Sequence, residues 1–132
     1  MIAFFTHNDQ ELDHTGSKHV GNIETTRAKL TAVFGEPYEG DGYKTAYEWD
    51  IKFLDGTFAT IYDWEHRFYK ADREMPWHIG GWSGLAIDNV NEALKQHAHP
   101  DYVRGWYEHH GLEYHAYKLD SGVNSPVLGW HL

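Results

Sequence analysis

Hydrophobic and polar residues follow two different periods along this chain, and the change of period predicts where its helices and strands lie. The short apolar run at residues 2–6 predicts an opening strand, and the polar, glycine-containing stretch 7–21 predicts a long loop. From about residue 23 to residue 34, apolar side chains recur at helical spacing, which predicts a first helix with Asn22 as its N-cap. Gly35 follows directly and predicts the end of that helix.

The clearest local feature is a β-hairpin between about residues 44 and 64. Two strand-like runs, 44–54 and 57–64, are joined by Asp55-Gly56, a residue pair typical of a two-residue turn. Such a turn fixes which residues face one another across the strands. The resulting pairs are Tyr47 with Trp64, Trp49 with Tyr62, Ile51 with Thr60 and Phe53 with Phe58. The rings at positions 47, 49, 62 and 64 are therefore expected on one face.

The other face of the same hairpin predicts an unfavourable pair of charges. The two-residue turn sets Glu48 directly opposite Asp63, and like charges across a sheet are destabilising, by roughly a few tenths of a kcal/mol or more. Either a cation neutralises the two carboxylates, or this end of the hairpin opens into water. One alternative is therefore a cation site built from Glu48, Asp63 and either Asp50 or His66.

The second half of the chain predicts one more strand and a second helix. Residues 77–79 read as a short strand that adds to the sheet. Gly80-Gly81 predicts a tight turn into a helix that spans about residues 85–98 and is capped by Ser83. After Pro100, the sequence predicts a short helix at 101–110, a last strand at 113–118 and an irregular tail at 119–132.

Together these elements predict an α+β fold in a single domain, residues 1–132. Its sheet is small and antiparallel, with the hairpin of about residues 44–64 at its centre. Two main helices, at about residues 23–34 and 85–98, are expected to pack on that sheet.

Charge and composition exclude several classes of protein. Acidic residues outnumber basic ones by 20 to 11, and the formal net charge of −9 argues against direct binding of nucleic acid. Cysteine is absent, so we expect neither disulfides nor thiolate metal sites. The N-terminus lacks the basic region of a signal peptide, and no apolar run approaches the roughly 20 residues of a membrane-spanning helix. We therefore expect a cytoplasmic protein with no membrane partner.

Aromatic residues and histidines are frequent for so short a chain. Aromatic residues make up 16% of the sequence, and there are 11 histidines. Protonation of every histidine would add 11 charges and move the formal net charge from −9 to +2. Because a small core does not readily bury this much aromatic surface, we also expect a homo-oligomer.

The sequence contains no motif that identifies an enzyme. It lacks the zinc-binding His-Glu-x-x-His pattern, the phosphate-binding loop, the Gly-x-Ser-x-Gly elbow and the dinucleotide fingerprint. The histidine pairs His97/His99 and His109/His110 do not have the spacing that brings two imidazoles onto one helical face. We therefore predict no catalytic residue, no metal ligand and no cofactor.

Five short motifs carry a resemblance to small accessory proteins of tailed bacteriophages. They are Phe34–Pro37, Glu48–Trp49, Asp55–Thr57, Tyr62–Trp64 and Trp77–Gly81. The shared pattern is a helix ending in Phe-Gly-x-Pro, a strand with Trp, an Asp-Gly-Thr turn, a Thr-Ile-Tyr strand and a Trp-His-Ile-Gly-Gly turn. The resemblance covers roughly residues 23–98 and implies a viral accessory protein in the host cytosol. By analogy, such proteins resemble counter-defence factors.

The first functional hypothesis is a protein that sequesters a nucleotide-derived host immune signal without chemistry. Bases stack on aromatic rings, and phosphates bind cationic side chains or free backbone N–H groups. The stacking surfaces would be Trp49, Tyr62, Trp64 and Trp77. The phosphate-binding groups would be Lys44, Arg67, His78 and the amides of Gly80 and Gly81.

Two alternatives come from other functional classes. An acidic protein can occlude a basic surface of a host defence effector, as an anti-CRISPR-like inhibitor does. The interface would then consist of Glu48, Asp50, Asp63, Trp106, Tyr107 and Trp130. A small metal-dependent hydrolase that uses carboxylate and histidine side chains is the third reading.

Overall fold

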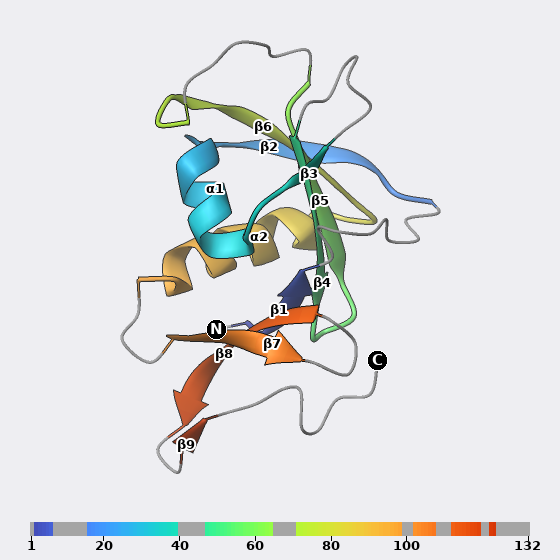
Figure 1. The fold of residues 1–132 in the computed structure, drawn as a ribbon. Coiled ribbons are helices and arrows are strands. Elements are labelled where there is room, and N and C mark those ends of the chain that lie inside the picture. Colours follow the sequence, from blue (N-terminus) through green and yellow to red (C-terminus); the bar gives the residue numbers. More distant parts are fainter. Residues whose placement is uncertain are drawn as a thin grey trace.

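The computed structural model describes residues 2–6, 16–39, 47–64, 71–98, 102–107, 112–119 and 122–123. In this part of the chain, one antiparallel sheet carries two helices, which confirms the predicted α+β class. The helices are α1 (Arg27–Phe34) and α2 (Leu85–Gln96). Figure 1 shows the sheet curving around them, so that both helices lie on the same side of it.

Five neighbouring strands form the part of the sheet on which the helices pack. In spatial order they are β2 (Lys18–Thr26), β6 (Glu74–Gly81), β5 (Phe58–Tyr62), β4 (Tyr47–Phe53) and β1 (Phe4–Thr6). The sheet continues from β1 into β8 (Leu112–Leu119) and β7 (Tyr102–Tyr107). Two short strands pair off this path, β3 (Tyr38–Glu39) with β4 and β9 (Gly122–Val123) with β8.

The first helix begins later than the sequence pattern predicts. Residues 18–26 form β2 and pair with β6, so the predicted loop at 7–21 and the predicted helix start at about 23 are wrong for these residues. Residues 7–15 of that predicted loop lie outside the described residues. Thr26, rather than Asn22, is the N-cap, and its hydroxyl accepts a hydrogen bond from the Lys29 N–H at 3.0 Å. Gly35 ends the helix as predicted.

The hairpin of β4 and β5 forms, but its turn has three residues instead of two. The Phe53 N–H donates to the Thr57 carbonyl at 2.8 Å, and the Gly56 N–H donates to the Phe53 carbonyl at 3.0 Å. Gly56 has a φ of +92°, as expected for a type I turn followed by a left-handed residue. Trp49 therefore pairs with Ile61 instead of Tyr62, and the predicted register is wrong by one residue.

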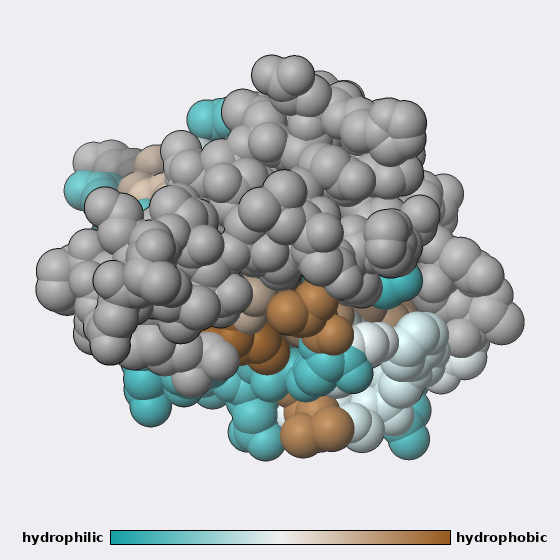
Figure 2. Space-filling view, turned by 90° about the horizontal axis from the view of Figure 1, so that it is seen from below, coloured by the Kyte–Doolittle hydropathy of each residue, from teal (hydrophilic) through white to brown (hydrophobic). Residues whose placement is uncertain are grey.

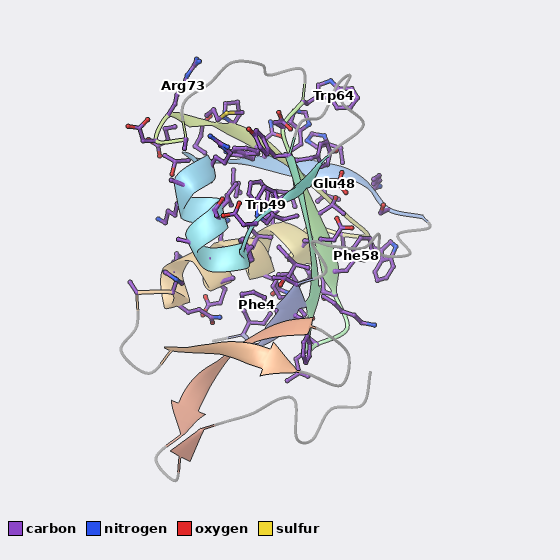
Figure 3. The ribbon with its side chains drawn as sticks, viewed as in Figure 1. Phe4, Glu48, Trp49, Phe58, Trp64 and Arg73 are labelled. Atoms are coloured by element: carbon purple, nitrogen blue, oxygen red, sulfur yellow. The ribbon has the colours of Figure 1, made fainter. Side chains whose placement is uncertain are left out.

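This shift moves the two halves of the predicted aromatic face to opposite sides of the sheet. Trp49 lies on the inner face, the side that carries the helices, whereas Tyr62 and Trp64 lie on the outer face. Figure 3 shows Trp49 pointing toward the helices and Trp64 lying away from them. The expectation that the rings at 47, 49, 62 and 64 share one face is therefore wrong.

The hydrophobic core lies between the inner face and the helices. The side chains of Trp49 and Trp77 meet edge to face, with ring centroids 5.4 Å apart, and neither is exposed. Each indole N–H donates to a backbone carbonyl, that of Trp49 to Gly35 at 2.8 Å and that of Trp77 to Thr25 at 3.1 Å. These bonds satisfy the one polar group of each ring, so both tryptophans are stable in the interior.

Gly80 and Gly81 are the last two residues of β6 and do not form the predicted turn. Gly80 pairs with Thr60 on one side and with His19 on the other. The chain leaves β6 only after Gly81, and α2 begins at Leu85, its predicted start, with Gly84 instead of the predicted Ser83 as its N-cap. The amides of both glycines thus belong to the strand ladder, where backbone N–H groups point toward neighbouring strands.

The segment after α2 extends the sheet. Residues 102–107 form β7, so the predicted helix at 101–110 is wrong there, while the predicted last strand is confirmed as β8. In the predicted irregular tail, Gly122–Val123 pairs with β8 as β9. The remaining tail residues, 120–121 and 124–132, lie outside the described residues.

Candidate functional site

Four rings gather on the outer face of the sheet, at the end of β5, and we call them the ring cluster. Its members are His19, Tyr62, Trp64 and His78. The His78 ring lies at the centre, with ring centroids 4.5 Å from His19, 5.5 Å from Tyr62 and 6.1 Å from Trp64. Trp64 is 39% exposed, and Figure 3 shows its side chain on the side of the sheet away from the helices. The cluster therefore presents aromatic surface to solvent.

The strand register explains why these rings meet. Tyr62 on β5 pairs with His78 on β6, and His78 pairs in turn with Asn22 on β2. His19 lies in the neighbouring row, opposite Gly80. A Cβ atom on Gly80 would come within 2.4 Å of the Thr60 hydroxyl oxygen and 3.6 Å of the Tyr62 ring. Only glycine leaves this position open beneath the cluster.

Not all of the outer face is accessible. Toward β1, most of its side chains are buried, namely Phe5, Asp50, Phe58 and Thr60, whereas Lys52 is exposed. Trp82 covers part of this region, because its ring stacks edge to face on Phe58 with centroids 4.2 Å apart. The accessible aromatic surface of the outer face is thus concentrated at the ring cluster and at Trp82.

Two polar contacts define the electrostatic character of the ring cluster. His19 Nε2 lies 2.7 Å from Asn22 Oδ1, which accepts a hydrogen bond and so favours a proton on that ring nitrogen. Burial raises the pKa of the Tyr62 phenol, and the negative charge of Glu48 raises it further. The cluster therefore has an acidic group beside Tyr62 and two imidazoles toward β2.

The predicted binding residues divide into three groups. Trp49 and Trp77 are completely buried in the core, so neither offers a ring face to a ligand. Tyr62, Trp64 and His78 come together in the ring cluster, with Gly80 beneath them. The other three do not join the cluster in the described structure. A Cβ on Gly81 would meet Ala86 on the inner face, and Lys44 and Arg67 lie outside the described residues.

The acidic residues proposed for an inhibitory interface or a cation site are placed differently from the prediction. Asp50 and Asp63 are completely buried and present no acidic surface to a partner. Asp63 does not face Glu48, because its Oδ1 accepts a hydrogen bond from the Tyr47 N–H at 3.0 Å and Glu48 pairs with Tyr62. Among the described residues, no group of three or more His, Asp or Glu side chains is arranged to hold a metal ion. His66 and the side chains of Trp106, Tyr107 and Trp130 lie outside the described part.

Sequence reasoning missed His19 and Asn22 because it placed both in or next to a loop. The stretch from Val20 to Thr26 contains several β-branched residues, and Ile23 and Thr25 alternate in burial with exposed neighbours. That alternation is the signal of a strand with one buried face, and it predicts that His19 and Asn22 point away from the core.

The described part of the chain has no helix with the length and apolar character needed to span a bilayer. Comparison of the sequence with protein-family models, with curated proteins and with solved structures found no match.

Proposed function

We propose that this chain binds a small nucleotide-type ligand at the ring cluster and sequesters it without chemical change. The ligand's base would stack against Trp64 and Tyr62 on the outer face of the sheet. The observation that carries this proposal is the grouping of three rings around that of His78, with Trp64 39% exposed at the edge of the group.

Base stacking on an open sheet face has a sufficient physical basis. Stacking of one base on an aromatic side chain contributes about 1–3 kcal/mol, and sheets that bind nucleotides use this contact because every base has a flat face. Of the described elements, none has to move aside at the ring cluster, because Trp64 already reaches solvent and both helices pack on the inner face. The buried Trp49 and Trp77 have no part in this proposal.

The biological role that we propose is counter-defence by a bacteriophage in the cytosol of its host. It is supported by the resemblance of residues 23–98 to small phage accessory proteins. Sequestration requires only that the ligand bind tightly, so a site built from rings without a catalytic constellation is compatible with it. The ligand would then be a nucleotide-derived immune signal.

The binding step is tested by titration calorimetry with a panel of cyclic and ADP-ribose-type nucleotides. We expect Trp64→Ala to weaken binding about tenfold, because it removes a stacking surface. Trp82→Ala is the matched control, since Trp82 is 50% exposed and lies outside the ring cluster. An equal loss in both variants, or no binding by the unaltered protein, would contradict the proposal.

The fate of the ligand separates sequestration from catalysis. The protein is incubated with each nucleotide that binds and is then heat-denatured, and the released molecules are identified by mass spectrometry. Recovery of the intact nucleotide supports sequestration, whereas recovery of a cleaved product would show an enzyme instead.

The prediction of a homo-oligomer is likewise carried forward as a proposal. It rests on the high aromatic content of the chain and on the two tryptophans that stay exposed among the described residues, Trp64 at 39% and Trp82 at 50%. Sedimentation velocity over a range of concentrations measures the mass directly. A sedimenting mass of one chain at all concentrations would contradict it.

A further inference from the structure

A row of outer-face residues crosses four strands and differs in charge from one end to the other. From β4 to β2 the row consists of Glu48, Tyr62, His78 and Asn22. Its β4 end is acidic, because it carries Glu48, whose charge also raises the pKa of the Tyr62 phenol after the larger effect of burial. Its β2 end has two imidazoles, His78 and the adjacent His19. A ligand that lies along this row meets a different chemistry at each end.

The two imidazoles lie side by side because of a glycine. His19 pairs across the strands with Gly80, and since Gly80 has no side chain, the His19 ring can lean onto His78 with ring centroids 4.5 Å apart. The hydrogen bond from His19 Nε2 to Asn22 Oδ1 orients the first of these rings. Two oriented imidazoles at this spacing repel each other when both are protonated, and an anion bound to both removes that repulsion.

The other charged groups around the imidazoles determine where an anion can bind. Glu48 on β4 lies at the far end of the row, beyond Tyr62. Glu24 on β2 and Glu74 on β6 are exposed and lie two and four residue pairs from His78 along these strands. An anion is therefore favoured directly over His19 and His78 and disfavoured toward either flank.

We propose that the ring cluster selects nucleotides over nucleosides, with the phosphate bound by His19 and His78 and the base stacked on Tyr62 and Trp64. This inference rests on the proposed function and adds to it the class of ligand and the orientation in which it binds. It also assigns the phosphate-binding role to imidazoles instead of backbone amides, since the amides of Gly80 and Gly81 belong to the sheet.

Such a site binds its ligand more tightly as the pH falls. Histidine side chains gain a proton between about pH 8 and pH 5, and an imidazolium makes a charge-assisted hydrogen bond to a phosphate that a neutral imidazole makes only weakly. A nucleoside has no phosphate, so its affinity has no reason to follow the same trend. An affinity that rises as the pH falls for the nucleotide, but not for the nucleoside, would thus indicate that the imidazoles bind the phosphate.

The experiment compares each nucleoside with its 3′,5′-cyclic monophosphate for the four common bases. A cyclic phosphodiester keeps a single negative charge between about pH 5.5 and pH 8, so any change in affinity arises from the protein. Titration calorimetry at both pH values gives four affinities for each base. We expect the cyclic nucleotide to gain about tenfold in affinity at the lower pH, while the affinity of the nucleoside stays within about twofold.

Variants separate the ring cluster from the general charge of the protein, which also becomes less negative as histidines are protonated. His19→Asn and His78→Asn are expected to abolish most of the pH-dependent gain. His97→Gln is the matched control, because it removes a histidine at the C-terminal end of α2, which packs on the inner face. Circular dichroism at both pH values checks that each variant is folded.

Each outcome decides between the two proposals. A pH-dependent gain that is confined to the cyclic nucleotides and lost in the two cluster variants supports the inference. Equal, pH-independent binding of nucleosides and cyclic nucleotides would overturn the inference while leaving the proposed function intact. A gain that survives both cluster variants, or is lost equally in His97→Gln, would show a general charge effect and overturn the inference. Failure of all four bases to bind in either form would overturn the inference, and failure of the ADP-ribose-type nucleotides as well would overturn the proposed function.

Discussion

Gly80 is a position where both the sheet and the candidate site require a residue without a Cβ atom. A Cβ at this position would lie 2.4 Å from the hydroxyl oxygen of Thr60, a buried and stiff β-branched residue that has little room to move. We therefore expect Gly80→Ala to lower the free energy of unfolding by about 1–3 kcal/mol through overpacking. Thermal unfolding followed by circular dichroism measures this as a drop of several degrees in Tm.

Gly84 provides the matched control for that substitution. It has a negative φ of −61°, and a Cβ there would meet no atom within 4 Å. Gly84→Ala is expected to change the free energy of unfolding by less than about 1 kcal/mol. If the two variants unfold at the same temperature, the close approach at Gly80 does not constrain the sheet.

Tyr62 offers a direct measurement of the charge asymmetry in the ring cluster. Burial raises the pKa of its phenol and Glu48 adds to the shift, so we expect Glu48→Gln to lower that pKa without returning it to the ordinary value. Because the folded pKa is raised, the effect stabilises the fold below the ordinary pKa of 10.0 and is lost as the pH rises through the folded value. Ultraviolet titration of tyrosinate, with Tyr62→Phe as the reference that removes this group, gives the pKa. An unchanged titration curve in Glu48→Gln would refute the coupling.

The limits of prediction at the residue scale are clearest for the tryptophans. Their number predicts a large aromatic surface, but composition does not say which rings pack in the core. Trp49 and Trp77 are interior because backbone carbonyls at Gly35 and Thr25 accept their indole N–H groups. Those partners are 14 and 52 residues away in sequence, so local pattern contains no sign of them.

At the scale of elements, the hairpin shows how one additional residue in a turn changes which side chains of two paired strands share a face. The Asp-Gly pair correctly predicts a turn, and it is compatible with loops of two or three residues. The structure has the longer loop, in which Gly56 alone adopts a positive φ, and the β5 side chains therefore exchange faces relative to β4. The sequence therefore predicts that the hairpin forms. It does not predict which side chains share a face, because the Asp-Gly pair is compatible with both loop lengths.

The same turn has a titratable group whose effect on stability can be measured. Burial alone would raise the pKa of Asp55, but hydrogen bonds from the Thr57 N–H at 2.9 Å and the Asn89 amide at 3.0 Å hold it below its ordinary value of 3.8. The ionised carboxylate thus stabilises the fold above that value, and the contribution is lost as the pH falls through the lower folded pKa. Asp55 is exposed, so solvent screening keeps the effect small.

We expect Asp55→Ala to lower the free energy of unfolding by about 1 kcal/mol at neutral pH and by less in acid. Asp55→Asn is the matched control, because asparagine also suits the turn and accepts hydrogen bonds but does not titrate in this range. Tm values measured between about pH 7 and pH 3 should show that the difference between the protein and Asp55→Asn narrows as the pH falls. A difference that is constant over this range would contradict a lowered pKa in Asp55.

Strand β2 marks a second limit at the scale of elements. Residues 23–26 fit a helical spacing and a strand alternation at once. The helical interpretation is wrong for these four residues, because β6 pairs with them, and is confirmed from Arg27 to Phe34. Tertiary pairing overrides such weak local preferences. This error also removed His19 and Asn22 from consideration, so the position of the candidate site depended on the strand being recognised.

On the scale of the whole molecule, the fold class was predictable and the extent of the sheet was not. The two helices and the hairpin are local patterns, and they suffice to predict one layer of helices on an antiparallel sheet. The path from β4 through β1 to β8 joins residues about a hundred positions apart, such as Phe4 and His115.

The surface of the molecule carries some exposed hydrophobic side chains. Figure 2 shows a face on which brown hydrophobic areas lie between teal hydrophilic ones. Four large hydrophobic residues are exposed among the described positions: Leu54, Trp64, Trp82 and Leu85.

A reciprocal pair of hydrogen bonds joins the backbone just before β1 to the last residue of α2. The Ile2 N–H donates to Gln96 Oε1 at 2.8 Å, and the Gln96 amide donates to the Ile2 carbonyl at 2.6 Å. Gln96 is only 3% exposed, so this polar side chain at the end of α2 is buried because it pairs with the backbone that leads into β1. It thereby fixes β1 between β4 and β8 relative to the helix layer.

We expect Gln96→Leu to lower the free energy of unfolding by about 1–3 kcal/mol, because it leaves the N–H and carbonyl groups of Ile2 without these partners. Asn91→Leu is the matched control, since it places the same side chain on an exposed position of the same helix. Native-state hydrogen exchange adds a local readout: amides of β1 should lose more protection than those of β6, which is separated from β1 by β5 and β4 in the sheet. If protection falls equally in both strands, Gln96 contributes to overall stability without anchoring β1 to α2.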